Sequence, residues 1–177
     1  MASRKALEIV KAFRRRLSLR HLMLNKAQAP TAILGLLKDH EIELSRLYGV
    51  YASKFPEYED FWTELSGEEV QHAEWIDELQ AKVADSPTDF VVDRFSIVAV
   101  VHSIEYVRKQ VQRVQHQEIT PMQAFSTALH LEEAPIEKKF FETFDGDSKE
   151  IEQTLALLAQ CTQDHYNKVH RMWMENE

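Results

Sequence analysis

The sequence predicts an all-α protein built as a bundle of long helices, and three observations support this. Apolar side chains recur every three or four residues along most of the chain, which is the period of an amphipathic helix. The 177 residues include only four glycines and five prolines, too few for a fold with many turns. No stretch of any length shows the alternation of apolar and polar residues that predicts a half-buried strand.

The composition restricts the classes of site that the protein can contain. Its single cysteine, Cys161, excludes an intramolecular disulfide and a cysteine-rich zinc or iron site. A lone cysteine fits a reducing compartment, so we expect a cytoplasmic protein. No apolar run reaches the roughly 18 residues that a membrane-spanning helix requires, and the charged first stretch does not have the pattern of a signal peptide.

Residues 1–28 are expected to form a basic amphipathic helix ahead of a bundle domain at residues 29–177. They carry eight Lys or Arg and one acid, a net charge of +7; because the whole chain carries −8, the remainder carries −15. This helix either attaches the protein peripherally to an anionic membrane surface or an acidic partner, or packs on the acidic bundle or a second subunit. Nucleic acid is not expected as a partner, because its phosphates would repel the acidic body.

Three helices should follow, each with one apolar stripe. The first covers about residues 31–54, and the second starts at Phe55-Pro56-Glu57 and ends near residue 84. A break of loop composition at residues 85–89 precedes a third helix at about residues 93–117. The expected buried stripes are Leu37, Glu41, Leu44, Tyr48, Tyr51 and Phe55; then Trp62, Leu65, Glu69, His72, Ile76, Leu79 and Val83; then Ile97, Val100, Ile104, Val107, Val111 and Val114.

Two further helices are expected in the last third of the chain. Thr120-Pro121-Met122-Gln123 supplies an N-cap residue, a proline at the first helical position and a glutamine that completes a capping box. Asp145-Gly146-Asp147 should end this helix and cap the next one. The expected buried faces are Phe125, Leu129, Glu133, Ile136, Phe140 and Phe144 on one helix, and Ile151, Leu155, Leu158, Thr162, His165, Val169 and Met172 on the other.

Glu69 and His72 interrupt an otherwise apolar helix face, on which residues three apart are neighbours. A buried ionised carboxylate must find a cation, a metal ion or a proton. A Glu-x-x-His pair that points into a bundle is a ligand pattern of di-iron and di-manganese carboxylate proteins. Such a site takes one Glu from each of two helices and a Glu-x-x-His pair from each of two others.

The candidate ligands are, in chain order, Glu41, the pair Glu69 and His72, then Glu105 and Glu133. The four carboxylates would balance the charge of two divalent ions. The second histidine of the pattern is missing, because Ile136 stands three residues after Glu133. Alternatively, the buried acids form ion pairs with Arg46, Arg94 or Arg108.

Two other histidines could replace the missing ligand. His102 lies one helical turn before Glu105, and the alternative is that it lies on the helix surface. His165 lies in the apolar stripe of the last helix, and the alternative is a core histidine that pairs with a carboxylate or carbonyl. Glu43, Glu68 and Glu132 adjoin ligand candidates but should face roughly 100° away from them on their helices.

Three segments of the chain resemble rubrerythrins, of the ferritin-like (di-iron carboxylate) superfamily. They are Glu41 followed by Tyr48 and residues 51–54; residues 68–73; and residues 131–140, where the motif histidine would fall at Ile136. Glu105, with His102 one turn before it, lies where the family carries two Glu residues three apart. The resemblance covers about residues 33–144 and leaves out the basic helix and the last helix.

This resemblance implies a ferritin-like four-helix bundle, here with an extra N-terminal basic helix and a C-terminal helix. It further implies a dinuclear iron or manganese site that reacts with peroxide or oxygen, in a homodimer supplied with electrons by an external donor. In that fold the second and third ligand helices run parallel. The connection at residues 85–92 spans at most about 26 Å, barely enough to cross the bundle, so a helix-swapped dimer is an alternative.

A second functional interpretation does not require turnover. The alternative is a degenerate ferritin-like bundle without turnover, which holds a metal ion or docks on a partner or membrane surface through residues 1–28. Iron storage is not indicated, because nothing in the sequence suggests a cage.

Overall fold

The computed structural model describes residues 29–85, 94–133 and 149–177, and within them every regular element is helical. This confirms the all-α helical bundle. The elements are α2 (Ala29–Lys54), a 3₁₀ turn η1 (Pro56–Tyr58), α3 (Glu59–Asp85), α4 (Arg94–His116), α5 (Pro121–Glu133) and α7 (Lys149–Asn176). The expected basic helix at residues 1–28, and Ile136 with the rest of residues 134–148, lie outside the described residues. No described helix has a segment apolar and long enough to span a bilayer.

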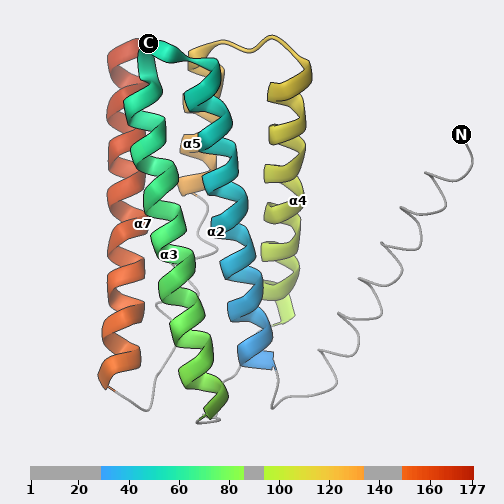
Figure 1. The fold of residues 1–177 in the computed structure, drawn as a ribbon, viewed down its shortest axis with the longest axis vertical. Helices are drawn as coiled ribbons and strands as arrows, with labels where there is room; N and C mark the ends of the chain where they lie inside the picture. Colours follow the sequence, from blue (N-terminus) through green and yellow to red (C-terminus); the bar gives the residue numbers. More distant parts are fainter. Residues whose placement is uncertain (1–28, 86–93, 134–148) are drawn as a thin grey trace, which may run out of the picture.

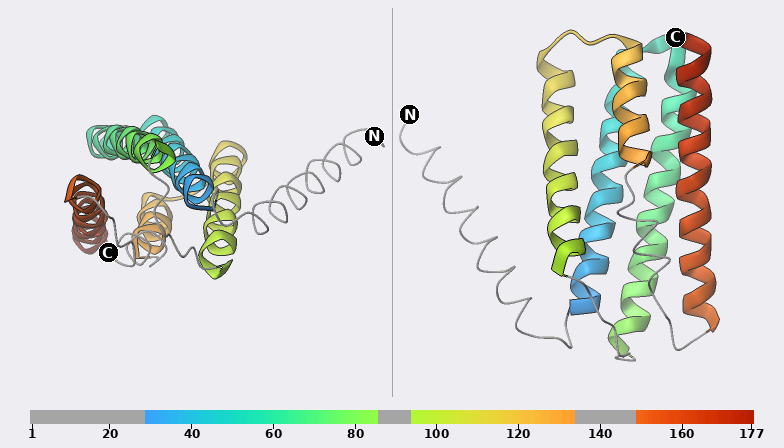
Figure 2. Two further views of the ribbon diagram at one scale, coloured as in Figure 1. Left: turned by 90° about the horizontal axis from the view of Figure 1, so that it is seen from below. Right: turned by 180° about the vertical axis from the view of Figure 1, so that it is seen from behind.

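The helices run roughly along one axis and alternate in direction (Figure 1). α2 lies between α3 and α4 and packs against both, while α5 packs against α7. α7 also contacts α3, so that the end-on view shows the helices arranged around a common interior (Figure 2). Ligand candidates on α2, α3, α5 and α7 can therefore meet inside the bundle.

The direction of α4 corrects the connectivity that the resemblance implied. α3 and α4 run antiparallel, with the end of α3 and the start of α4 at the same end of the bundle (Figures 1 and 2). The two ligand helices expected to be parallel are therefore not parallel. Only residues 86–93 separate the two helices, and such short connections favour antiparallel helices. The argument for a helix-swapped dimer, which rested on a long crossover, no longer applies.

Local sequence signals account for two of the helix starts. Pro56 opens the turn that precedes α3, where its missing N–H is of no consequence. At the start of α5, the Gln123 backbone N–H donates to Thr120 Oγ1 at 3.3 Å, and the Thr120 N–H donates to Gln123 Oε1 at 3.0 Å. This reciprocal pair confirms the predicted capping box.

The core consists of two apolar clusters, one above the other along the bundle axis. The upper cluster contains Trp62, Tyr48, Tyr51, Phe125 and Val169, and the lower cluster contains Leu37, Ile76, Leu79, Ile104 and Leu158. The polar residues on α2, α3 and α7 fall between them in sequence: Glu41 between Leu37 and Leu44, Glu69 and His72 between Leu65 and Ile76, and His165 between Leu158 and Val169. A polar layer thus separates the two clusters.

The predicted stripes are buried on α2, α3 and α4, and on α7 every described stripe residue is buried except Met172, which is partly exposed. The predicted face of α5 is correct at Phe125 but wrong at Glu133. Its buried residues are Ala124, Phe125, Ala128, Leu131 and Glu132, whereas Glu133 is exposed. The reason is geometric: at about 100° per residue, seven positions return a helix to within about 20° of the same face, whereas eight overshoot it by about 80°. Glu132, seven residues after Phe125, therefore shares its face.

Gly67 offers a test of the helical register of α3. It is exposed in the helix interior, and a Cβ at this position would meet nothing within 4 Å. Gly67→Ala should therefore raise the free energy of unfolding, measured by urea denaturation, by about 0.5–1 kcal/mol. Gly35→Ala is the matched control, because its Cβ would lie 3.1 Å from Gln80 Nε2 and should bring a smaller gain or a loss. Equal effects of the two substitutions would contradict the packing described for α2 and α3.

Candidate metal centre

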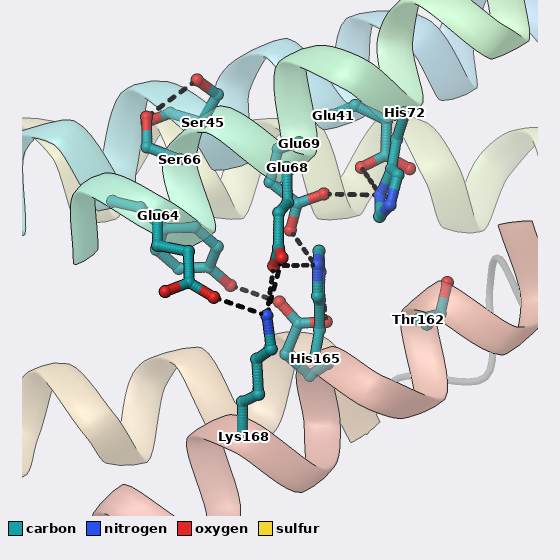
Figure 3. A network of polar contacts seen from close by, with 12 residues as sticks. Glu41, Ser45, Glu64, Ser66, Glu68, Glu69, His72, Thr162, His165 and Lys168 are labelled. Atoms are coloured by element: carbon teal, nitrogen blue, oxygen red, sulfur yellow. Dashed lines mark hydrogen bonds and ion pairs between the residues drawn. The ribbon is translucent and has the colours of Figure 1, made fainter. Parts of the chain in front are cut away.

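Five ionisable side chains from four helices meet in the polar layer. Glu41 comes from α2, Glu69 and His72 from α3, Glu132 from α5 and His165 from α7, and each is less than 9% exposed. Figure 3 shows Glu41 of α2, Glu69 and His72 of α3, and His165 of α7 converging on one another. The layer therefore concentrates three carboxyl groups and two imidazoles between the two apolar clusters.

Glu69 lies at the centre of this group and joins the two imidazoles. Its Oε2 is 3.0 Å from His72 Nδ1, and its Oε1 is 3.0 Å from His165 Nδ1. The two rings are stacked, with centroids 4.8 Å apart and planes inclined by 24°. Each oxygen of one carboxylate thus faces one ring nitrogen, and both rings turn the same nitrogen toward it.

A further carboxyl group lies beside each imidazole. Glu41 Oε2 is 3.9 Å from His72 Nδ1, and Glu132 Oε2 is 4.0 Å from His165 Nδ1. The buried Tyr48 hydroxyl donates a hydrogen bond of 2.5 Å to Glu132 Oε1. The group consequently has two similar halves, each with one imidazole and one outer carboxyl, which share Glu69.

The pKa values show how strongly the group is coupled without a metal ion. Burial opposes ionisation of Glu69, but hydrogen bonds with His165 and His72 outweigh it and hold the Glu69 pKa well below its usual range. Burial likewise opposes protonation of His165, yet its hydrogen bond to Glu69 and the nearby charges of Glu69, Glu132 and Glu68 raise its pKa to about 9. Burial, with the charges of Glu132 and Glu69, raises the Tyr48 pKa well above 10. The metal-free group therefore contains a buried Glu69–His165 ion pair.

The structure brings together Glu41, Glu69, His72 and His165, but not the other predicted ligands. His102, Glu105 and Glu133 are exposed. On α4, Ile104 and Val107 face the interior at the height of the polar layer. His102 and Glu105 lie on another side of the same helix and therefore face away from the interior.

The predicted ion pairs with arginine are also placed elsewhere. Both arginines contact Glu43 of α2, on the side that faces α4. Arg108 Nε is 2.6 Å from Glu43 Oε1, and Arg46 Nη1 is 3.9 Å from Glu43 Oε2. The side chain of Arg94 lies outside the described residues. Glu43, not the acids of the polar layer, is therefore the partner of Arg46 and Arg108.

Glu132 is the member of the group that sequence reasoning ranked too low. The stripe on α5 was extended in steps of four residues from Phe125, which drift about 40° each and lead to Glu133. A step of seven residues from Phe125 leads to Glu132 instead. This spacing was the signal in the sequence that Glu132 shares the buried face of Phe125. Glu68 was also ranked low, and it contacts the outer nitrogen of His165 at 2.9 Å.

A pocket of about 430 Å³ between α3 and α7 reaches this group from the surface, and both His72 and His165 line it. Trp75 and Cys161 also line the pocket, together with the charged side chains of Glu68 and Lys168. Burial and neighbouring acids raise the pKa of the Cys161 thiol, so it is protonated at neutral pH. The pocket gives small molecules access to the imidazoles.

No model of a known protein family, no curated protein and no solved structure matches this chain. The chemistry of the polar layer must therefore be argued from its own residues.

Tyr48→Phe should destabilise the metal-free protein by about 1.5–3 kcal/mol, because it removes the hydroxyl that donates to the buried Glu132 carboxyl. Urea unfolding after treatment with a chelator measures this loss. Tyr51→Phe is the control: its hydroxyl pairs with the neutral Thr127, so about 1 kcal/mol is expected. A loss at Tyr48 no larger than at Tyr51 would contradict a charged hydrogen bond to Glu132.

Proposed function

We propose that the protein binds two divalent transition-metal ions, iron or manganese, in the polar layer. The observation that carries this proposal is the position of Glu69, whose two oxygens each face a different imidazole at 3.0 Å. Glu69 would bridge the two ions. Glu41 and His72 would complete one half, and Glu132 and His165 the other.

The distances between donor atoms fit this assignment. Nitrogen and oxygen ligands lie about 2.1 Å from a divalent transition-metal ion, so two ligands of one ion are at most about 4.2 Å apart. In each half, the distances from the imidazole Nδ1 to its two carboxylate oxygens, 3.0 and 3.9 Å for His72 and 3.0 and 4.0 Å for His165, lie within that limit. Glu69, His72 and His165 alone also offer donor atoms that all lie within 4.8 Å of one another, so a small contraction would let them hold one ion.

The charge of the layer supports the same conclusion. Three buried carboxyl groups share the polar layer with two imidazoles, and the pKa of His165 is raised to about 9, so this ring balances one negative charge at neutral pH. Burial of ionised groups in an apolar interior is costly, and divalent ions bound between these carboxylates would offset their negative charge. The combination of imidazole and carboxylate ligands suits iron and manganese.

A rubrerythrin-like oxidoreductase that acts on hydrogen peroxide or oxygen is the activity that the sequence resemblance suggests for such a centre. The pocket between α3 and α7 supports it, because it gives small molecules access to His72 and His165. Bound iron or manganese would supply the redox chemistry. The chain's own residues would hold the ions, exclude water on the side of the apolar clusters, and position the Tyr48 hydroxyl on Glu132. An external donor would supply the electrons.

Metal content after anaerobic reconstitution with Fe²⁺ or Mn²⁺, measured by mass spectrometry on desalted protein, tests the proposed centre. We expect about two ions per chain in the wild type. Glu69→Ala should retain none, because both ions lose their shared ligand. Glu41→Ala and Glu132→Ala should each retain about one, because each leaves one half intact.

Neighbouring acids provide matched controls. Glu133→Ala adjoins Glu132 and removes the same charge, and Glu105→Ala removes an exposed acid on α4, so neither should change the metal content. Circular dichroism confirms that each variant is folded. About one ion in the wild type, lost in Glu69→Ala, would restrict the centre to Glu69, His72 and His165. No bound metal would reject it and favour a degenerate bundle that docks on a partner or membrane surface.

Hydrogen peroxide consumption tests the second, catalytic part of the proposal. Iron-loaded protein with a chemical reductant should consume peroxide, and Glu69→Ala should lose this activity together with the metal. Glu133→Ala serves again as the control for protein that retains its iron. Equal rates in the wild type and Glu69→Ala would reject turnover at this centre.

A further inference from the structure

We propose that Glu68, held in place by Lys168, is the positioning residue for His165 as a metal ligand. This inference rests on the proposed metal centre and adds a role for two residues outside it. Neither Glu68 nor Lys168 is fully buried, and both line the pocket between α3 and α7.

His165 lies between two consecutive carboxylates of α3. Its Nδ1 is 3.0 Å from Glu69 Oε1, and its Nε2 is 2.9 Å from Glu68 Oε2 (Figure 3). Consecutive helical residues point about 100° apart, so Glu69 points into the bundle while Glu68 points toward α7. The two carboxylates therefore contact the imidazole ring from both sides, one at each nitrogen.

This arrangement defines which ring nitrogen is free to bind a metal ion. A neutral imidazole carries one N–H, and the nitrogen without it is the ligand. In the Glu69–His165 ion pair both ring nitrogens carry a proton, one facing each carboxylate. A metal ion held by Glu69 and Glu132 would displace the proton of Nδ1, and Glu68, which can only accept, would keep the N–H on Nε2. A carboxylate on the outer N–H also makes the imidazole a stronger ligand.

Lys168 fixes the position of Glu68. Its Nζ is 2.6 and 2.8 Å from the two oxygens of Glu68 and 2.9 Å from Glu64 Oε1. Lys168 lies on α7 three residues after His165, so the same helix supplies both the imidazole and the cation that orients its carboxylate partner. The Glu68 side chain is 35% exposed, and without Lys168 it would be free to turn into solvent.

The two halves of the centre differ in this respect. Among the described residues, the outer nitrogen of His72 makes no such contact, and that ring lines the pocket instead. Loss of Glu68 should therefore lower the affinity for the ion beside His165 and leave the affinity for the ion beside His72 unchanged.

Titration of the full-length protein with Co²⁺ measures this difference. Glu68→Ala should lower the affinity for the ion at His165 by about 10- to 100-fold, and Lys168→Met should lower it by less, because the carboxylate remains. Glu64→Ala is the matched control, since Glu64 contacts the same Lys168 but is not among the carboxylates that contact His165, and it should have no effect.

Proton NMR of the Co²⁺ protein provides a readout of ring positioning that is independent of activity. The Nε2–H of a cobalt-bound His165 should give one strongly shifted signal that exchanges slowly with D₂O, because Glu68 holds it. Glu132→Ala should remove the signal together with its ion, which assigns it. In Glu68→Ala the signal should exchange rapidly, whereas Glu68→Gln should keep it, because the amide oxygen still accepts the hydrogen bond.

The outcomes separate the metal centre itself from the positioning role of Glu68. If the wild type binds Co²⁺ and Glu68→Ala changes neither the affinity nor the exchange of the signal, the positioning role is overturned and the metal centre stands. If the wild type binds no Co²⁺, both fall. A selective loss at the His165 half in Glu68→Ala, absent in Glu64→Ala, supports the positioning role.

Discussion

The arrangement of the bundle interior depends on one buried charge, the carboxylate of Glu69. At 1% exposure it cannot be stabilised by water, and an unpaired carboxylate in such a position would cost several kcal/mol. The contacts of Glu69 with His72 and His165 meet this requirement in the metal-free protein. The contact between Glu69 and His165 also fixes the position of α7 along α3, so that Lys168 of α7 lies beside Glu68 of α3.

The two apolar clusters determine what kind of group can form between them. Tyr48 and Trp62 pack above the polar layer, and Leu37 and Ile76 lie below it, so the carboxyl groups are confined to a thin slab. α4 packs against α2 and covers one side of the bundle with Ile104 and Val107, while its Ser103 hydroxyl contacts the buried His40. The pocket between α3 and α7 opens another side. Apolar surroundings strengthen electrostatic interactions within the polar layer, and the pocket admits small molecules to it.

Much of this could be predicted from the sequence, because the stripes on α2, α3, α4 and α7 follow helical geometry closely. Glu41, Glu69 and His72 were found in this way. The face of α5 was misassigned through steps of four residues, which exchanged the buried Glu132 for the exposed Glu133. The docking of α7 on α3 could not be predicted, because helical periodicity reveals which face is buried but not which helix covers it. The direction of α4 could have been predicted from the short connection at residues 86–93, but the resemblance favoured a parallel arrangement.

The position of His165 changes how the missing ligand motif should be judged. A Glu-x-x-His spacing is one way to place an imidazole beside a carboxylate, and the last motif of the chain has Ile136 where it requires a histidine. A ligand set is defined in space, and α7 places His165 against Glu69 and within 4.0 Å of Glu132. The proposed centre therefore needs no histidine at position 136. The helix that supplies the imidazole lies outside the region of resemblance, so agreement with the motif is a poor measure of whether the centre is complete.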